Sequence, residues 1–182
     1  MLIDPPFLLE KAKEKAKSEG VSVEWVLEDM RHFIRPLSYD LVLNMFTSFG
    51  YFDDKNDDLK VLENVFVCLK PGGIFLIDVM GKERIAKILQ STISEVLDDG
   101  TIIVQRPEIF DDWTRVRNDW IIIKKNIAKT FKFHHTIYSG QELKDRMELV
   151  GFEAIKLYGN LDGSPYDSNA QRLVITGLKP SK

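Results

Sequence analysis

Two uninterrupted apolar runs, residues 41–43 and 74–77, constrain the fold of this chain more than any other feature of its sequence. Runs without polar residues are typical of strands that are buried on both faces of a sheet. An amphipathic pattern over 57–69 predicts a helix between them, and Pro71-Gly72-Gly73 ends that helix before the second run. Because a strand, a helix and a strand follow one another, we expect an α/β fold built on a mostly parallel sheet with helices on both faces.

The chain changes character at residue 93. From 93 to 138, short strand-like pieces are separated by turn residues, which predicts an antiparallel β insertion on the parallel sheet. Ser139 and Glu142 then have the spacing of a capping box at the start of a helix. The other predicted elements are strands over 1–3 and 21–27, helices over 7–19, 82–90 and 139–150, and closing strands over 152–158 and 172–176.

Length and composition are those of an ordinary globular protein. The 182 residues fit one domain, which we take to span 1–182 and to include the insertion 93–138. The chain has 25 lysines and arginines against 28 aspartates and glutamates, so we do not expect it to bind nucleic acid through bulk charge. No apolar run approaches the ~20 residues of a membrane span, and the N-terminus lacks the basic start of a signal peptide. We therefore expect a cytoplasmic protein without a membrane anchor.

Residues that form disulfides or bind metals are scarce. Cys68 is the only cysteine, which excludes an internal disulfide and a cysteine-ligated structural zinc within one chain. His134 and His135 are adjacent on a predicted strand and therefore point to opposite faces, so they do not chelate one ion together. We expect no metal site.

Ligands of open α/β sheets bind beyond the carboxyl ends of the strands, so the residues after each apolar run are candidates for a binding site. These are Asp4, the sequence EDM at 28–30, the aromatic-rich stretch 44–52 and the sequence DVM at 78–80. Their carboxylates suit hydroxyl and amine donors, and their aromatic and methionine side chains suit a flat ring. Because no phosphate-binding loop is among them, the pattern indicates a nucleoside-like ligand without a pyrophosphate.

Four pieces of the sequence occur in a characteristic order: Asp4, EDM at 28–30, YDLVLNMFTSFGYF at 39–52 and LKPGGIFLID at 69–78. In this order they resemble the class I methyltransferases that use S-adenosylmethionine (SAM). The resemblance covers nearly the whole chain, including the β-rich insertion and the closing sequence GFEAIKLYGNLDGSPY. It implies a Rossmann-like, doubly wound sheet, SAM as the cofactor, and methyl transfer to a small-molecule acceptor.

The resemblance also implies roles for individual residues. Asp4 would hold the ribose hydroxyls, Asp29 would contact the adenine amino group and Met30 would lie beside the ring. Asn44, Met45 and Phe46 would border the methionine part of the cofactor. The residues expected on the substrate side, next to the insertion, are Tyr51, Phe52, Tyr138, Tyr166 and Arg172. No residue is identified as the general base.

Each role has a structural alternative, and the sequence does not decide between the two. Asp4 is also a suitable helix cap before Pro5-Pro6, and Asp29 is also a suitable turn residue after a strand. The aromatic side chains around Tyr51 also suit simple packing.

The sequence departs from the family in one respect: no strand with a glycine-rich G-x-G-x-G turn precedes Met1. The usual first strand of the sheet, between the strands at 1–3 and 41–43, is therefore missing, and unpaired ladder groups are costly when buried. Three outcomes stay open: the neighbouring strands pair directly, a second copy lends a strand, or the sequence is a fragment of a longer product. We favour the fragment as the origin of the sequence. The alternative function is an inactive remnant that serves as an interaction or scaffold protein, with a homodimer formed through the open sheet edge.

Overall fold

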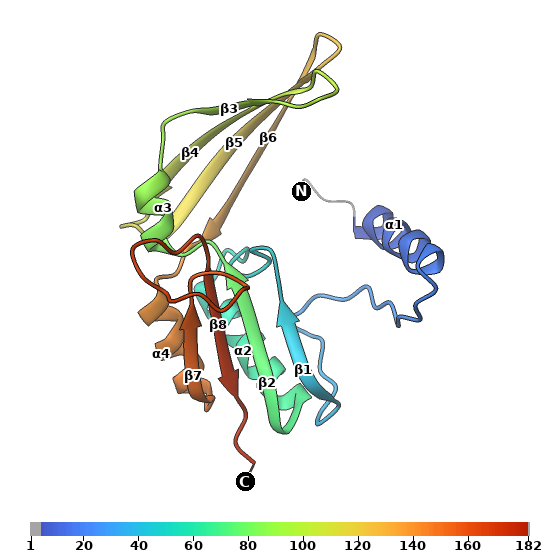
Figure 1. Ribbon diagram of the computed structural model, residues 1–182, viewed down its shortest axis with the longest axis vertical. Coiled ribbons are helices and arrows are strands. Elements are labelled where there is room, and N and C mark those ends of the chain that lie inside the picture. Colours follow the sequence, from blue (N-terminus) through green and yellow to red (C-terminus); the bar gives the residue numbers. More distant parts are fainter. Residues whose placement is uncertain (1–4, 182) are drawn as a thin grey trace.

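The structure is a computed structural model that describes residues 5–181. It contains two sheets, sheet A at the base of the molecule and sheet B above it (Figure 1). The helices are α1 (Pro5–Ser18), α2 (Lys55–Cys68), α3 (Lys82–Ile88) and α4 (Gly140–Val150). The strands are β1 (Tyr39–Asn44), β2 (Leu69–Val79), β3 (Ile93–Val96), β4 (Ile102–Phe110), β5 (Arg115–Lys124), β6 (Ile127–Thr136), β7 (Glu153–Tyr158) and β8 (Leu173–Leu178).

Sheet A has the strand order β1-β2-β8-β7. The pairing of β1 with β2 is parallel, as the strand–helix–strand pattern predicts, and Val42 lies beside Phe75 in this register. Strand β8 is antiparallel to both of its neighbours, so β1, β2 and β7 point in the same direction. The sheet is therefore mixed, and its last strand in the sequence is an inner strand of the sheet.

The main core lies between sheet A and helices α2 and α4, which cover the same face (Figure 1). Local capping signals start both helices, at the predicted residue for α4 and two residues before the predicted start for α2. Asp54 caps α2 by accepting a hydrogen bond from the backbone N–H of Asn56, and Ser139 forms the predicted capping box of α4 with Glu142. The fully buried side chains between these layers include Phe49, Leu62, Leu69, Phe75, Ile77, Leu143, Met147, Leu173 and Ile175.

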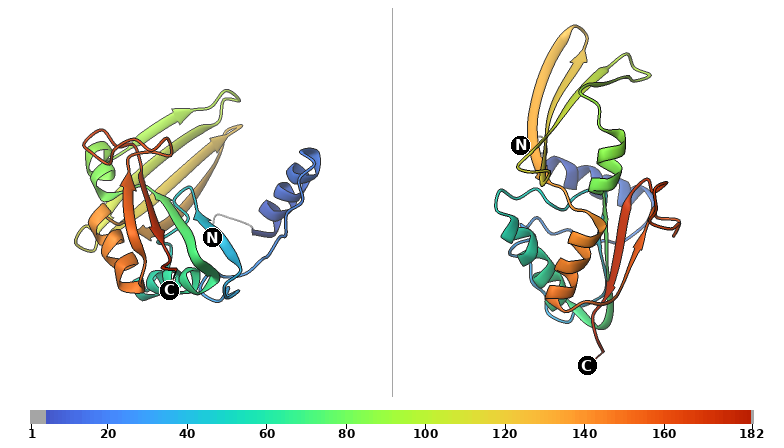
Figure 2. Two further views of the ribbon diagram at one scale, coloured as in Figure 1. Left: turned by 60° about the horizontal axis from the view of Figure 1, so that its bottom comes forward. Right: turned by 90° about the vertical axis from the view of Figure 1, so that its left-hand side faces the viewer.

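The other face of sheet A is open at β1, which corrects the expectation of a strand buried on both faces. Leu41 and Leu43 are 52% and 54% exposed, because they point away from the α2 side on which Val42 packs. Helix α1 lies apart from both sheets in Figures 1 and 2. The apolar run 41–43 therefore forms the predicted strand, but without a covering layer on this side.

The strand predicted over 21–27 is wrong: the structure gives these residues no regular secondary structure. Val21, Val23 and Leu27 are exposed, and none of residues 5–181 pairs with them in a ladder. A strand exists only where a neighbour takes its hydrogen bonds, so an alternating pattern alone does not create one.

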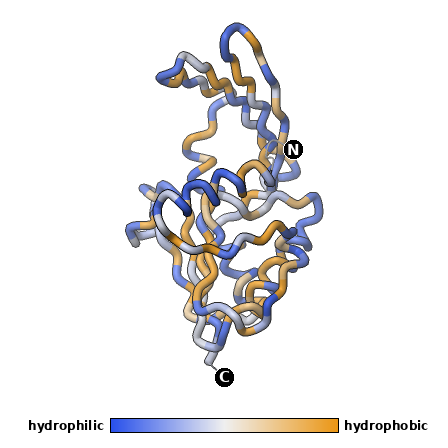
Figure 3. Tube along the Cα trace, turned by 90° about the vertical axis from the view of Figure 1, so that its right-hand side faces the viewer, coloured by the Kyte–Doolittle hydropathy of each residue, from blue (hydrophilic) through white to orange (hydrophobic). Residues whose placement is uncertain are grey.

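Sheet B is the predicted antiparallel insertion, with the order β3-β4-β5-β6. It stands above the end of sheet A at which β1 and β2 finish, as the two views of Figure 2 show. Hydrophilic residues mark the two outer turns of sheet B, after β3 and after β5, with apolar residues along the strands (Figure 3). Sheet B thus overhangs the strand ends at which the sequence places the site.

Candidate active site

The carboxylate of Asp78, at the end of β2, joins three segments of the chain. It is fully buried, and Oδ2 accepts a hydrogen bond of 3.0 Å from the backbone N–H of Phe46. Oδ1 accepts from Nε of Arg172, and a second guanidinium nitrogen of Arg172 donates to Oγ1 of Thr47 at 3.2 Å. The loop after β1, the end of β2 and the start of β8 are therefore held together by one carboxylate.

The loop after β1 has an unusual backbone. Phe46 and Thr47 both have φ of 57°, in the left-handed region where a residue with a Cβ costs roughly 1–2 kcal/mol. The backbone N–H of Thr47 also donates to the carbonyl oxygen of Asp78, at 2.9 Å. Asp78 thus accepts from two successive N–H groups of the strained turn, and the turn directs the Phe46 ring into solvent, where it is 79% exposed.

A cavity of about 380 Å³ lies beside β1 and brings together two predicted cofactor residues, Met30 and Asn44. Its wall includes side chains from both faces of β1, so the cavity reaches around the open edge of that strand. Oδ1 of Asn44 is buried and has no hydrogen-bond partner among the described residues. The remaining wall consists of Phe33, Tyr39, Leu41, Val42, Leu43, Val61, Asn64, Val65, Cys68 and Phe75.

Asp29, directly before Met30, is bound by Arg31. Its Oδ2 atom accepts from Arg31 Nη2 at 2.6 Å, and its Oδ1 atom accepts from the Arg31 backbone N–H at 2.9 Å. Hydrogen bonds from the Arg31 side chain lower the pKa of Asp29 to about 2, so the carboxylate is ionised at neutral pH. Arg31 also pairs with Asp57 at 2.8 Å and lies 4.6 Å from the centre of the Phe52 ring. An amino group that contacts Asp29 would therefore share it with Arg31.

The other predicted cofactor residues are not in this cavity. Asp4 lies outside the described residues, so its convergence with Asp29 stays a prediction. Met45 and Phe46 belong to the strained loop and do not line the cavity. The carbonyl oxygen of Met45 accepts a hydrogen bond of 2.6 Å from the Ser48 hydroxyl within that loop.

Tyr51 is the predicted substrate-side residue that contacts the insertion most directly. Its ring stacks on His135 with centroids 4.9 Å apart and lies 6.4 Å from the Phe133 ring. His135 is buried, its Nδ1 atom has no partner among residues 5–181, and burial lowers its pKa to about 4. The imidazole is therefore neutral at pH 7. On the opposite face of β6, His134 contacts Asp53 at 3.0 Å, as expected for adjacent strand residues.

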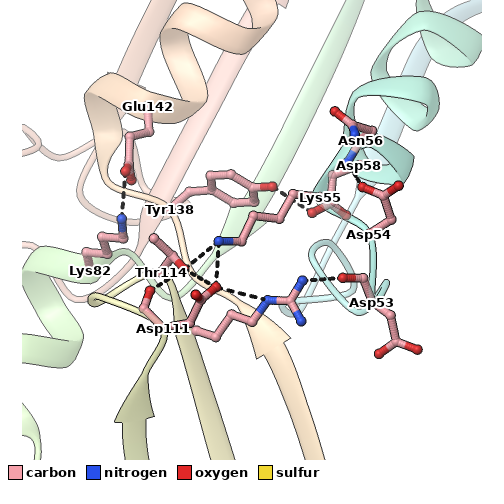
Figure 4. A network of polar contacts seen from close by, with 11 residues as sticks. Asp53, Asp54, Lys55, Asn56, Asp58, Lys82, Asp111, Thr114, Tyr138 and Glu142 are labelled. Carbon is pink, nitrogen blue, oxygen red and sulfur yellow. Dashed lines mark hydrogen bonds and ion pairs between the residues drawn. The ribbon is translucent and has the colours of Figure 1, made fainter.

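The hydroxyls of Tyr138 and Tyr166 already donate to carboxylates. The buried Tyr138 donates to Oδ2 of Asp58 at 2.6 Å (Figure 4), and burial together with the Asp58 charge raises the pKa of the Tyr138 hydroxyl. Tyr166 donates to Oε2 of Glu83 at 2.7 Å. These two hydrogen bonds connect the segments that carry the tyrosines to α2 and α3. Arg172, in contrast, donates to Asp78 at the end of β2.

Sequence reasoning missed the roles of Asp78 and His135. Asp78 stands directly after the apolar run 74–77, a position that marks strand-end ligands, but its pairing with Arg172 spans 94 residues and leaves no local signal. In the sequence, His135 is notable only as one of two adjacent histidines that do not bind one metal ion together. No group of three or more His, Cys, Asp or Glu side chains in the described part of the chain is arranged to hold a metal ion.

Comparison with known proteins identifies the fold. Residues 3–73 match a family model described as a methyltransferase domain. YqeM of Bacillus subtilis (strain 168), a provisionally named methyltransferase, is 22% identical over 177 residues, which are 94% of this chain and 71% of YqeM. A SAM-dependent methyltransferase from Clostridium acetobutylicum ATCC 824 superposes with a TM-score of 0.77 at 16% identity, over 94% of this chain and 71% of that one. The chain has the class I methyltransferase fold.

A second solved structure, the CcbJ methyltransferase from Streptomyces caelestis, gives a TM-score of 0.79 at 15% identity and covers 93% of this chain and 69% of its own. The family resemblance and the α/β fold class predicted from the sequence are thereby confirmed. No helix among residues 5–181 is long and apolar enough to span a membrane.

Proposed function

We propose that the chain is a SAM-dependent methyltransferase that acts on a small-molecule acceptor. The observation that carries this proposal is the unpartnered Oδ1 atom of Asn44, which lies at the carboxyl end of β1 in one cavity with Met30. In a sheet of this type, a ligand site is expected at this end.

The residues present fit the cofactor. A buried carbonyl oxygen without a donor suits an ammonium group, which supplies N–H donors and no acceptor. The apolar side chains of Met30, Phe33 and Tyr39 suit a flat adenine ring, and about 380 Å³ is within the usual range for small-molecule sites. SAM supplies a methyl group on a positively charged sulfur atom when it is bound.

The residues of this chain would bind and orient SAM, and they would not themselves form bonds to the methyl group. Asn44 would accept from the ammonium group, Met30 would pack on the adenine, and Asp29 would face the adenine amino group. Asp78 would keep the Phe46 loop in its left-handed shape beside the reacting groups. Positioning of this kind is the main source of rate in a methyl transfer, because the nucleophile must reach about 3–3.5 Å from the methyl carbon.

Two features support a small acceptor bound under sheet B. The fold is shared with the amino pentose methyltransferase CalS10 and the sugar N-methyltransferase KedS8, at TM-scores of 0.60 and 0.63. The face of sheet B that meets Tyr51 carries Phe133 and the neutral His135, which offer an aromatic surface and an unprotonated ring nitrogen. A neutral imidazole is suited to accept a proton from an amine or hydroxyl acceptor.

Calorimetric titration with S-adenosylhomocysteine tests the proposal. We expect micromolar binding that weakens about tenfold or more in Asn44→Leu, since a charge-assisted hydrogen bond is lost. Asn126→Gly is the control: Asn126 lies in the turn between β5 and β6 at φ of 61°, which glycine adopts readily, and it is remote from the cavity wall. No heat at millimolar ligand would refute cofactor binding by this chain.

A second candidate function, an interaction protein that self-associates, is favoured by the open edge of β1. An antiparallel pair of β1 strands centred on Val42 would place Leu41 of one copy opposite Leu43 of the other, on the face where both are exposed. Light scattering is expected to give a dimer that Leu41→Lys dissociates and that Leu161→Lys, an exposed loop control, leaves intact. A wild-type monomer at all concentrations would exclude this arrangement.

A further inference from the structure

A small second cavity lies where sheet B joins the core, away from the cavity beside β1. Its volume is about 70 Å³. Three cations line it, and each comes from a different helix: Lys55 from α2, Lys82 from α3 and Arg146 from α4. Figure 4 shows two of them at this junction, where Lys55 points to Asp111 and Thr114 and Lys82 points to Glu142. The rest of the wall is formed by Thr114, Thr136, Ile137, Tyr138 and Glu142.

The two lysines keep donors for a further partner. Lys55 Nζ donates to Oδ2 of Asp111 at 2.8 Å and to Oγ1 of Thr114 at 2.6 Å. Lys82 Nζ donates to Oε1 of Glu142 at 2.6 Å. Because an ammonium group has three N–H donors, one remains on Lys55 and two remain on Lys82 with no acceptor among the described residues.

Arg146 and Thr136 add more unused donors. The Arg146 guanidinium lies 5.1 Å from the centre of the Tyr138 ring and has no hydrogen-bonded carboxylate in the described part of the chain. Thr136 is 4% exposed, and its Oγ1 atom has no partner there either. A buried polar atom without a partner is uncommon and indicates a bound water or ion.

The carboxylates around the cavity do not use up this donor capacity. Glu142 is the one carboxylate in the wall, and it is paired with Lys82. Outside the wall, Asp111 is paired with Lys55. Asp58 accepts a hydrogen bond from the Tyr138 hydroxyl (Figure 4). The wall residues themselves therefore carry three positive charges against one negative charge, and N–H donors of the cations remain unused. Behind the wall, Asp58 interacts electrostatically with Arg146 and keeps one buried oxygen, Oδ1, without a partner among the described residues.

We propose that this cavity binds a small tetrahedral oxyanion of the phosphate or sulfate type. Such an ion accepts several hydrogen bonds at once, so it would satisfy Thr136 together with Lys82 and Arg146. A volume of about 70 Å³ holds one small ion or a few water molecules, since one water occupies roughly 30 Å³ in the liquid, and it excludes a nucleotide. The ion would connect β6 of the insertion with helices α3 and α4 of the core.

The test is the stability of the full chain against increasing inorganic phosphate at constant ionic strength, with sulfate and chloride as parallel series. A ligand that binds only the folded state raises the unfolding temperature along a saturable curve. We expect saturation with phosphate and sulfate and no comparable effect of chloride. Isothermal titration with phosphate gives the dissociation constant independently.

Two variants remove donors without adding a new polar group. Arg146→Met and Thr136→Val are each expected to weaken phosphate binding, by about tenfold or more for the arginine. The matched controls are Lys144→Met, which removes a surface cation from the same helix, and Thr130→Val, which changes an exposed threonine of the same strand. Both controls are expected to bind phosphate as the wild type does. Thr136→Val conserves shape, so it keeps the test valid where Arg146→Met does not fold.

Two results would overturn the proposal. An unfolding temperature that rises without saturation, equally in the wild type and in both cavity variants, would identify a general salt effect. No response to phosphate or sulfate would show that the cavity holds water only. Neither result depends on SAM binding, so they leave the proposed methyltransferase function untouched.

Discussion

Arg172, at the start of β8, donates to the fully buried carboxylate of Asp78, which lies at the end of β2. The same carboxylate accepts the backbone N–H of Phe46 at 3.0 Å. The Asp78 side chain therefore neutralises a partly buried arginine and fixes the loop that borders the proposed cofactor site.

Asp78→Asn is expected to destabilise the fold by about 3 kcal/mol, because it leaves a partly buried guanidinium without its counter-charge. Urea unfolding measures this loss. The double variant Asp78→Asn with Arg172→Met removes both charges and should recover part of it, whereas Asp40→Asn, which breaks an exposed pair with Lys70, should cost under about 1 kcal/mol. Equal losses in the single and the double variant would contradict the coupling of Asp78 to Arg172.

Stability should fall between about pH 6.5 and pH 4 because of His135. Burial lowers the pKa of His135 to about 4 in the folded state, below the value of 6.5 expected when unfolded. The unfolded chain therefore binds a proton first as the pH falls, and the neutral folded form loses up to about 3 kcal/mol over this window. Urea unfolding of His135→Gln should show a smaller decrease over the same pH range, and His32→Gln, an exposed control, should behave as the wild type does.

Tyr138→Phe should cost about 1–3 kcal/mol, because the buried Asp58 carboxylate loses the hydroxyl that donates to it at 2.6 Å. Burial already raises the pKa of Asp58, and the Tyr138 hydroxyl opposes that shift. Without the hydroxyl, Asp58 is expected to take up its proton at a higher pH, which a titration followed by NMR of the carboxyl carbon would record. Tyr158→Phe is the matched control, and a similar loss there would argue against a specific role for the Tyr138 hydroxyl.

Gly50→Ala should destabilise the fold by more than about 2 kcal/mol. Gly50 has φ of 100°, and an added Cβ would lie 2.5 Å from the carbonyl oxygen of Thr136. Gly100→Ala separates backbone strain from the steric clash, because Gly100 also has a positive φ, of 78°, but nothing lies within 4 Å of the added Cβ. We expect this control to cost only the backbone strain, roughly 1–2 kcal/mol by thermal unfolding. Equal effects at both glycines would mean that the approach of Gly50 to β6 is looser than the structure indicates.

Local signals in the sequence predicted those parts of the fold that depend on neighbouring residues. The capping box of Ser139 and Glu142 and the strand–helix–strand unit around α2 both appear as expected. The strand over 21–27 and the double burial of 41–43 failed, because both depend on what lies beside the segment rather than on its own pattern. The residues around Leu41 show that an apolar run predicts a strand better than it predicts burial.

The sequence placed both candidate residues after apolar stretches, but only Asn44 ends a strand, since the segment 21–27 before Met30 has no regular structure. Met30 and Asn44, placed after two different apolar stretches, do line one cavity. The binding of Asp29 by Arg31 and of Asp78 by Arg172 was not visible, because a charge pattern does not say which side chains meet once the chain has folded. For the same reason the donor-rich cavity around Thr136 has no counterpart in the linear sequence.

The inner position of β8 has a consequence for how this protein is made. Residues 173–178 leave the ribosome after the other strands of sheets A and B, yet they separate β2 from β7 and bring Arg172 to its carboxylate. Until they emerge, β2 keeps one edge without a partner and Asp78 has no counter-ion, so the nascent chain presents an unfinished sheet from the synthesis of β2 to that of β8. Domains generally fold as units during translation, and here the unit closes only with its final strand.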